Sequence, residues 1–402
     1  MVGLTIDLPS DSEAIKTFGA KFSGAVNRQL QSDVPVAVFL SGGLDSSAIA
    51  FETLASKKLK DAYTIDFNSE DSSIDYQSND LHYANIFAKK FDLNLHRVKV
   101  DFESLSILPE IVQFMEDGYT DPSAILTYLI SREARKAGFK VMLSGQGADE
   151  YLGGYRRHVL EYFISSALGS ALSPIGRFLP RMPNIRAGRL GTMVRRFNLA
   201  KELISQPDRQ RILRYFTWAE KADITPLFLC DVKTDYDEKL RDHYNSIRTH
   251  DPFEDLLRLD QRYDLRSLNL AYSDHMSMAS SVELRVPFLD FDLLRFVNSL
   301  PTHLKIRGNN SKYILRKSME GKIPREIIYR SKAGFGMPLR SWLRSNNPLL
   351  NHYFDKKRID KQGIFDSVAL SRLIAEQASG RVDRSYMLFT LLVQQVWLDY
   401  KI

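Results

Sequence analysis

The chain has 402 residues, which is long for one hydrophobic core and favours two domains or one domain with a large addition. With 44% apolar and 26% charged residues, its composition is typical of a soluble globular protein. The single cysteine, Cys230, excludes an internal disulfide and fits a reducing compartment. The N-terminal residues lack the basic and apolar regions of a secretory signal, and no stretch is long enough to span a bilayer. We therefore expect a cytoplasmic protein.

The net charge is +6, and much of the positive charge lies in one segment. Seven Lys or Arg residues lie between Arg177 and Lys201, and no acidic residue occurs between Glu161 and Glu202. A solvated helical insertion explains such a segment, and an anionic partner, either RNA or a lipid head group, is the alternative. We do not expect a nucleic acid partner, whereas peripheral membrane contact through 177–201 stays open.

Predicted strands and helices alternate between residues 34 and 145. The apolar run VPVAVFL at 34–40 is typical of a buried parallel strand, and residues 46–58 have helical spacing. Further strands are predicted at 62–67, 95–100 and 140–144, and further helices at 75–92, 104–116 and 123–137. This alternation predicts an α/β fold with a doubly wound parallel sheet.

After about residue 155 the apolar pattern becomes helical, without clear alternating runs. We therefore expect an α/β domain at 1–155 and a mostly helical region at 156–402. Because ligands bind at the carboxyl ends of parallel strands, the loops that follow the strands of the first domain are the candidates for function.

The loop SGGLDSS at 41–47 lies between the first predicted strand and the next helix. A strand, a glycine-rich turn and a helix N-terminus together form an anion site. The loop has no lysine, so it does not match the common P-loop pattern, and it carries Asp45 instead. A tight turn with Asp45 as a helix N-cap is the alternative interpretation.

A second loop, SGQGADEYLGGY at 144–155, follows another buried strand and carries Asp149 and Glu150. We expect Asp45 and Asp149 to converge at one edge of the sheet. Paired carboxylates beside a phosphate site usually hold Mg²⁺, so both residues are candidate metal ligands. The residues expected to bind phosphate oxygens directly are Ser41, Gly42, Gly43 and Ser46.

These motifs resemble those of a known family. SGGLDSS after a strand is the signature of the PP-loop ATP pyrophosphatases, which cleave ATP between its α and β phosphates. Five further motifs resemble the synthetase domain of asparagine synthetases, and the resemblance extends from about residue 14 to the end. They are DPSAILTYLISREAR at 121–135, LSGQGADEYLGGYRR at 143–157, MSMASSVELRVPFLD at 276–290, SKYILRKSM at 311–319 and RSKAGFGMPLRSWL at 330–343.

The resemblance implies a PP-loop domain of the adenine nucleotide alpha hydrolase type at 1–155, with 156–402 completing the active site. It implies ATP and Mg²⁺ as cofactors, the metal being held by Asp45 and Asp149. The ATP-binding residues that it implies are Leu40, Ser41, Gly42, Gly43, Asp45, Ser46, Ile65, Ser144 and Gly145.

Two lysines, Lys312 and Lys332, are similar to family lysines that lie near pyrophosphate and the acyl-adenylate. Cleaving ATP leaves a highly charged pyrophosphate, and fixed cations stabilise the charge that develops in the transition state. Both lysines are therefore candidate catalytic residues, with a surface lysine as the alternative for each. The segment ELRVPFLD adds Glu283, Arg285 and Asp290, which either line the acceptor pocket or form structural ion pairs.

The chain departs from the family in two respects. Glutamine-hydrolysing members begin with a domain whose nucleophile is a cysteine after the initiator Met, but here position 2 is Val2 and the sole cysteine is Cys230. Free ammonia, a separate glutaminase subunit or an amine must then supply nitrogen; alternatively, the sequence is a fragment of a longer chain. The family's usual glutamate is Gln146 here, a candidate catalytic residue that keeps hydrogen bonding but lacks the charge.

The sequence therefore predicts an AMP-forming carbon–nitrogen ligase of the asparagine synthetase type. A small-molecule carboxylate is activated as an acyl-adenylate and transferred to ammonia or an amine. Two other hypotheses remain: another PP-loop adenylase that acts on RNA, and a non-catalytic nucleotide-binding partner subunit.

Overall fold

The computed structural model describes residues 10–55, 60–67, 79–166, 169, 194, 198, 201–231, 235–331, 334, 336–344 and 347–401. By its packing the chain divides into two compact units. The first comprises Met1–Val159 and Asp260–Met337, and the second Leu160–Leu259 and Pro338–Ile402. Residues 260–337 thus pack with the α/β part of the chain, while the predicted domain division at residue 155 stays a prediction.

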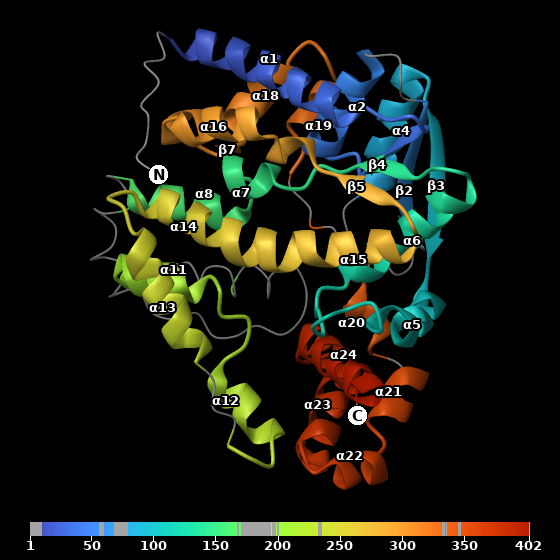
Figure 1. Ribbon diagram of the computed structural model, residues 1–402. Coiled ribbons are helices and arrows are strands. Elements are labelled where there is room, and N and C mark those ends of the chain that lie inside the picture. The colour runs from blue at the N-terminus through green and yellow to red at the C-terminus, as the bar shows by residue number, and fades with distance from the viewer. Residues whose placement is uncertain are drawn as a thin grey trace. The chain divides into compact units, whose positions relative to one another are not determined.

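A five-stranded sheet of parallel neighbours forms the centre of the first unit (Figure 1). Its order is β3-β2-β1-β4-β5. The bounds of the strands are β1 Val36–Phe39, β2 Asp61–Phe67, β3 Asn94–Val100, β4 Val141–Leu143 and β5 Glu283–Arg285. The predicted α/β fold with a parallel sheet is confirmed, and its first four strands lie where the apolar runs predicted them.

The strand β5 was not expected, because the sequence indicated only helices after residue 155. It has three residues, which is too short to show an alternating pattern, and it pairs with β4 from Val141↔Glu283 to Leu143↔Arg285. This strand places residues 283–285, which follow α15 (Ala271–Ala279), at the edge of the central sheet.

The order of the strands creates a topological switch point. The chain runs from β1 outward to β2 and β3 and then returns to β4 on the other side of β1. The loops that leave β1 and β4 therefore diverge from adjacent strands, and this is where parallel α/β sheets bind their ligands. Residues 40–43 and 144–147 form these two loops.

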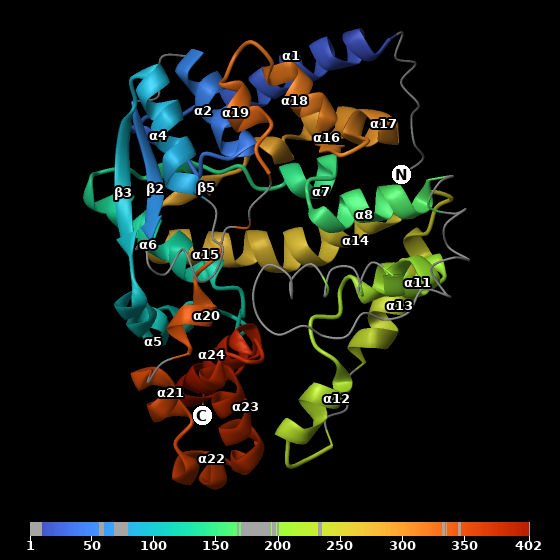
Figure 2. The same cartoon turned by 180° about the vertical axis from the view of Figure 1, so that it is seen from behind.

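Helices cover both faces of the sheet: α1, α2 and α16 lie on one side, and α6 and α15 on the other (Figures 1 and 2). The helices of the first unit are α1 Asp11–Gln29, α2 Leu44–Ala55, α4 Asp80–Phe91, η1 Phe102–Ile107, α5 Leu108–Val112, α6 Ser123–Lys136, α7 Ala148–Leu152, η3 Gln261–Leu270, α15 Ala271–Ala279, η4 Pro287–Leu289, α16 Phe291–Ser299, α17 Thr302–Lys305, α18 Tyr313–Met319 and α19 Arg325–Ile328. A short hairpin, β6 Ile306–Arg307 and β7 Asn310–Ser311, precedes α18.

The main hydrophobic core lies beneath α1. Ser10 caps this helix by accepting from the N–H of Glu13, and Phe18 and Phe22 are fully buried on its inner face. The Phe22 ring stacks on Phe288, with ring centroids 4.8 Å apart. Residues distant in the sequence therefore share one core, in which α1 packs on α16 and α18.

The second unit is helical, apart from an isolated bridge between Phe228 and Phe365, within the residues that the structure describes. Arg211 and Glu161 are both buried and form a bidentate ion pair with two contacts of 2.8 Å. This pair joins α11 (Asp208–Arg214) to α8 (Arg156–Ser165), whose first residues belong to the first unit and whose later residues belong to the second unit. The helices of the second unit, besides α8, are α11 Asp208–Arg214, α12 Lys221–Ile224, η2 Thr225–Leu227, α13 Tyr236–Ile247, α14 Pro252–Asp260, α20 Leu339–Trp342, α21 Pro348–Tyr353, α22 Lys356–Gln362, α23 Ser367–Ser379 and α24 Ser385–Lys401.

No helix in the described part of the chain combines the length and the apolar character that crossing a membrane requires. The basic segment 177–201 lies almost entirely outside the described residues. Whether this segment is a solvated insertion or binds an anionic partner stays untested.

Replacing Phe22 by alanine tests how much the core beneath α1 contributes to folding. We expect Phe22→Ala to lower the free energy of unfolding by about 3–5 kcal/mol, because it removes a fully buried ring and leaves a cavity. Urea denaturation measures this loss. Phe291→Ala is the matched control, since that ring is 76% exposed and its loss should change stability by less than about 0.5 kcal/mol. Equal losses in both variants would contradict this description of the core.

Candidate active site

The loop after β1 turns sharply because Gly42 has a positive φ of 65°. A Cβ atom at Gly42 would lie 2.5 Å from the backbone nitrogen of Ala84 in α4, so only glycine allows this close approach. Inside the loop, the N–H of Ser41 donates to Ser46 Oγ at 3.2 Å, and the N–H of Gly43 donates to Ser41 Oγ at 3.4 Å. Backbone donors and hydroxyls thus converge at the N-terminus of α2, as an anion site requires.

The loop after β4 lies directly against the first loop. A Cβ atom at Gly145 would lie 3.0 Å from Asp45 Cβ and 3.1 Å from the Ser46 nitrogen. Leu40 and Ser144 are held by neighbouring strands, since their N–H groups donate to Tyr63 O at 2.8 Å and Arg285 O at 2.9 Å. The structure therefore brings the residues expected to bind ATP together, with Ile65 buried in the adjacent strand β2.

Lys312 joins the two loops through a buried ion-pair triad. Its Nζ lies 2.5 Å from Asp45 Oδ2 and 2.7 Å from Asp149 Oδ1, and only 4% of its side chain is exposed. The Lys312 backbone is left-handed, with φ 53°, and its N–H donates to Leu152 O at 3.1 Å. Because non-glycine residues rarely adopt this conformation, the surrounding structure must hold it in place.

Gly154 makes room for the triad. A Cβ atom at this position would lie 1.9 Å from Asp149 Oδ1 and 2.1 Å from Lys312 Cε. No side chain therefore fits between the carboxylate and the lysine stem. Gly154 is therefore needed to let the two charged side chains meet.

Gln146 presents one unsatisfied acceptor. Its Nε2 donates to Ser273 Oγ at 2.5 Å and to the backbone carbonyl of Asn269 at 3.4 Å. Since a carbonyl can only accept, the amide nitrogen must face Asn269. The Oε1 atom is then left buried and without a hydrogen-bond partner.

A polar network beside the second loop was not expected from the sequence. Glu150 is buried and accepts from Tyr155 Oη at 2.6 Å and from Asn269 Nδ2 at 3.1 Å. Asn269 belongs to η3, a π-helix, a form that is rare and frequently found at functional sites. Burial and the neighbouring Asp149 raise the pKa of Glu150 to about 7.

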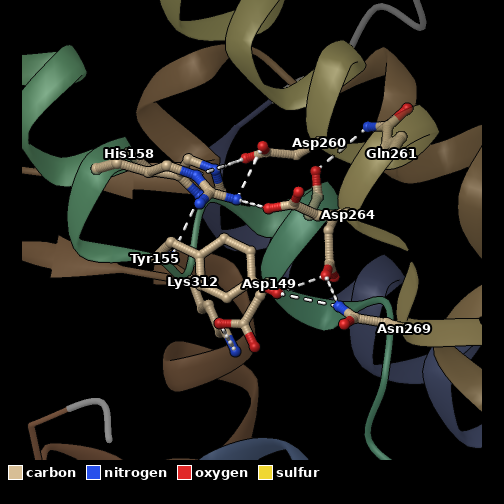
Figure 3. A network of polar contacts seen from close by, with 10 residues as sticks. Asp149, Tyr155, His158, Asp260, Gln261, Asp264, Asn269 and Lys312 are labelled. Carbon is tan, nitrogen blue, oxygen red and sulfur yellow. Dashed lines mark hydrogen bonds and ion pairs between the residues drawn. The ribbon is translucent and has the colours of Figure 1, made fainter. Parts of the chain in front are cut away.

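Figure 3 shows how this network continues behind Tyr155. His158 accepts at Nδ1 from the N–H of Tyr155, so its proton lies on Nε2, which contacts the Asp260 carboxylate. Arg157 donates to Asp260 at 2.9 Å and also pairs with Asp264. These contacts tie the start of α8 to the residues around the start of η3 and so hold Asn269 opposite Glu150.

Several candidates occupy other positions. Arg285 donates to the carbonyls of Gln29 and Gln31 and pairs with Glu283, and Asp290 caps α16 and pairs with Arg28; both arrangements are structural ion pairs. Lys332 lies outside the described residues, and its role stays a prediction.

The two carboxylates also fit a metal ion. Asp45 Oδ1 is buried without a hydrogen-bond partner, and one cationic nitrogen already lies within 2.7 Å of an oxygen of each carboxylate. In the described parts of the chain no cluster of three or more His, Cys, Asp or Glu is arranged to hold a metal. A metal here would need further oxygens from phosphates and water, as Mg²⁺ in nucleotide sites does.

The switch point of this parallel α/β sheet thus brings together a glycine-rich loop at a helix N-terminus, a carboxylate pair and a buried lysine. The family model for asparagine synthase matches residues 17–399, so the chain belongs to the asparagine synthase family. This confirms the resemblance found in the motifs.

Three relatives illustrate this similarity. A Mycobacterium tuberculosis protein, provisionally named a glutamine-hydrolysing asparagine synthetase, is 30% identical over 388 residues, which cover 94% of this chain and 56% of the relative. Asparagine synthetase (glutamine-hydrolysing) 1 of Bacillus subtilis is 29% identical over 385 residues, covering 93% and 57%. The amidase chry2 of Gibberella zeae is 25% identical over 405 residues, covering 90% and 58%. The chain thus spans a little over half the length of these relatives.

Gly154→Ala tests the packing of the ion-pair triad. We expect a loss of about 1–3 kcal/mol in the free energy of unfolding, because the added methyl group overlaps Asp149 and Lys312. Urea denaturation measures this change. Gly19→Ala is the control, since its Cβ would meet nothing closer than Ser318 Cβ at 3.9 Å and alanine favours a helix. An unchanged free energy of unfolding in Gly154→Ala would contradict this description, because it would mean that Asp149 and Lys312 can move apart at little cost.

Glu150→Gln tests the buried carboxyl group. The folded pKa of about 7 exceeds the unfolded value of roughly 4.3, so the folded state binds more protons between these values and loses stability as the pH rises. Without divalent ions, the variant should gain roughly 1–3 kcal/mol relative to wild type between pH 4.5 and 8. Chemical denaturation at several pH values measures the difference, and a difference that does not vary with pH contradicts the assignment.

Proposed function

We propose that the chain is an ATP-dependent, amide-forming synthetase that activates a carboxylate as an acyl-adenylate. The observation that carries this proposal is the meeting of the two loops of the switch point, with Lys312 between Asp45 and Asp149. Membership of the asparagine synthase family supports it, as do two relatives whose names describe glutamine-hydrolysing asparagine synthetases.

The loop from Ser41 to Ser46 binds the phosphates of ATP in this proposal. Its hydroxyls and backbone N–H groups converge at the N-terminus of α2, where the helix dipole favours anions. Leu40, Ile65, Ser144 and Gly145 frame the adenosine from the carboxyl ends of β1, β2 and β4.

Asp45 and Asp149 are the residues that would hold Mg²⁺. The bound ion would neutralise charge on the phosphates of ATP and favour the release of pyrophosphate. Lys312 approaches the same carboxylates and supplies a fixed positive charge beside the pyrophosphate. We assign the same task to Lys332 from its motif alone.

The reaction has two steps. A carboxylate oxygen of the substrate attacks the α-phosphorus of ATP, and pyrophosphate leaves. The nitrogen of ammonia or an amine then attacks the acyl carbon, and AMP leaves. The protein contributes positioning and preorganised charge, since phosphoryl chemistry demands little else from it.

Gln146 acts on the acceptor side of the site. Its Nε2 is committed to Asn269 and Ser273, so the remaining Oε1 can accept a hydrogen bond from an N–H or O–H group of the substrate. A neutral amide gives an ammonium group less attraction than a glutamate would. We therefore propose a small-molecule carboxylate as the substrate, with ammonia, an amine or a separate glutaminase subunit as the source of nitrogen.

The products of ATP turnover test the reaction. With ATP labelled in the α-phosphate, a panel of carboxylates beginning with aspartate, and ammonium as the nitrogen donor, we expect labelled AMP and an equal amount of pyrophosphate. Thin-layer chromatography separates AMP from ADP, and Asp45→Asn serves as the inactive control.

Labelled ADP would contradict the proposed cleavage between the α and β phosphates. ATP binding without turnover across the panel, in the presence of RNA as well as small carboxylates, would instead favour a non-catalytic nucleotide-binding subunit. Turnover that requires RNA would favour an RNA-modifying adenylase.

A further inference from the structure

Arg330 makes three contacts around the first loop, and none of the motif roles described above includes it. Its guanidinium donates to the carbonyl of Gly42 at 2.8 Å and forms an ion pair with Asp80 in the first turn of α4. The guanidinium carbon also lies 4.5 Å from the centroid of the Tyr83 ring. Only 8% of the Arg330 side chain is exposed, so these partners enclose it.

The contact with Gly42 fixes the orientation of one peptide group. In a planar trans peptide the carbonyl and the following N–H point in opposite directions. While Arg330 holds the Gly42 carbonyl on the side of α4, the N–H of Gly43 must point to the opposite side. There it faces the interior of the loop, where it now donates to Ser41 Oγ at 3.4 Å.

We infer that Arg330 is a positioning residue that locks the Gly42–Gly43 peptide so that the Gly43 N–H faces a bound phosphate. This inference rests on the proposed function, because it requires the first loop to bind the phosphates of ATP. The long, weak bond from Gly43 to Ser41 is the one that a phosphate oxygen replaces.

The Gly42–Gly43 peptide needs an external restraint because glycine has no side chain to limit its backbone dihedral angles. Gly42 has φ 65°, and the residue after it is also glycine, so both dihedrals that flank the peptide are free of side-chain constraints. The close packing of Gly42 on Ala84 holds the Cα atom but not the peptide plane. The guanidinium supplies the missing restraint.

Arg330 is not itself a phosphate ligand in this arrangement. Its charge is paired with Asp80, and its flat face is covered by Tyr83. Lysine cannot reproduce the set of contacts, because one ammonium group cannot donate to a carbonyl and a carboxylate in the guanidinium's fixed geometry while stacking on a ring. Arg330→Lys therefore keeps the positive charge but loses the combination of contacts that fixes the Gly42–Gly43 peptide.

Calorimetric titration with ATP and with adenosine tests the inference. For Arg330→Lys we expect ATP to bind about tenfold more weakly, whereas adenosine, which has no phosphate, changes its affinity by less than about twofold. The control is Arg285→Lys. Arg285 also donates to backbone carbonyls and pairs with a carboxylate, but at Gln29, Gln31 and Glu283, so both affinities should stay at the wild-type values.

Asp80→Asn provides a second test that keeps Arg330 in place and loosens its anchor, and it should weaken ATP binding in the same direction by a smaller factor. It also decides the question if Arg330→Lys does not fold. Unchanged ATP affinity in the folded variants, or an equal loss for ATP and adenosine, would overturn the inference. If wild-type protein binds adenosine but gains nothing from the phosphates of ATP, the proposed function fails first.

Discussion

The candidate site depends on one electrostatic constraint: two largely buried carboxylates that lie close together need a positive charge between them. Asp45 and Asp149 lie in the first turns of α2 and α7, which follow different loops, and without Lys312 their mutual repulsion and their partial burial would both oppose this arrangement. The lysine meets Asp45 across 267 residues of sequence. The geometry of the site is therefore set by the position of Lys312 at the start of α18 as much as by the two loops.

This constraint explains why glycine recurs at the site. Gly42, Gly145 and Gly154 each lie where a Cβ atom would come within about 3 Å of another chain segment or of the triad. A larger residue at Gly145 or Gly154 would push against the charged side chains themselves, and one at Gly42 would push the first loop away from α4. The glycines permit the approach, and the ion pairs and the Arg330 guanidinium then restore the order that glycine lacks.

Local patterns were enough to predict the parallel sheet, both loops and the meeting of Asp45 with Asp149, because apolar strands and glycine turns have short-range signatures. Other features have no such signature. The strand β5 is too short to show an alternating pattern. The residues of η3 follow the hydrogen-bond pattern of a π-helix, so the usual α-helical spacing does not predict which of them share a face. The hydrogen bond between Asn269 and Glu150 joins residues that are 119 positions apart in the sequence. Arg330 lay within a recognised motif, but its contacts with Gly42 and Asp80 depend on tertiary packing.

The two sides of the site differ in their chemistry. On the side that we propose binds phosphates, a buried ammonium and two carboxylates lie beside the N-terminus of α2, whose backbone N–H groups carry partial positive charge. The hydrogen-bond partners of Gln146 are neutral: the Ser273 hydroxyl and the backbone carbonyl of Asn269. The Oε1 atom of Gln146 itself is also neutral and has no hydrogen-bond partner. Strong charges suit phosphates, whose charge is common to every reaction of ATP. Neutral hydrogen-bonding groups discriminate by shape and by the position of donors, so under the proposed function we assign the choice of substrate to the side that carries Gln146.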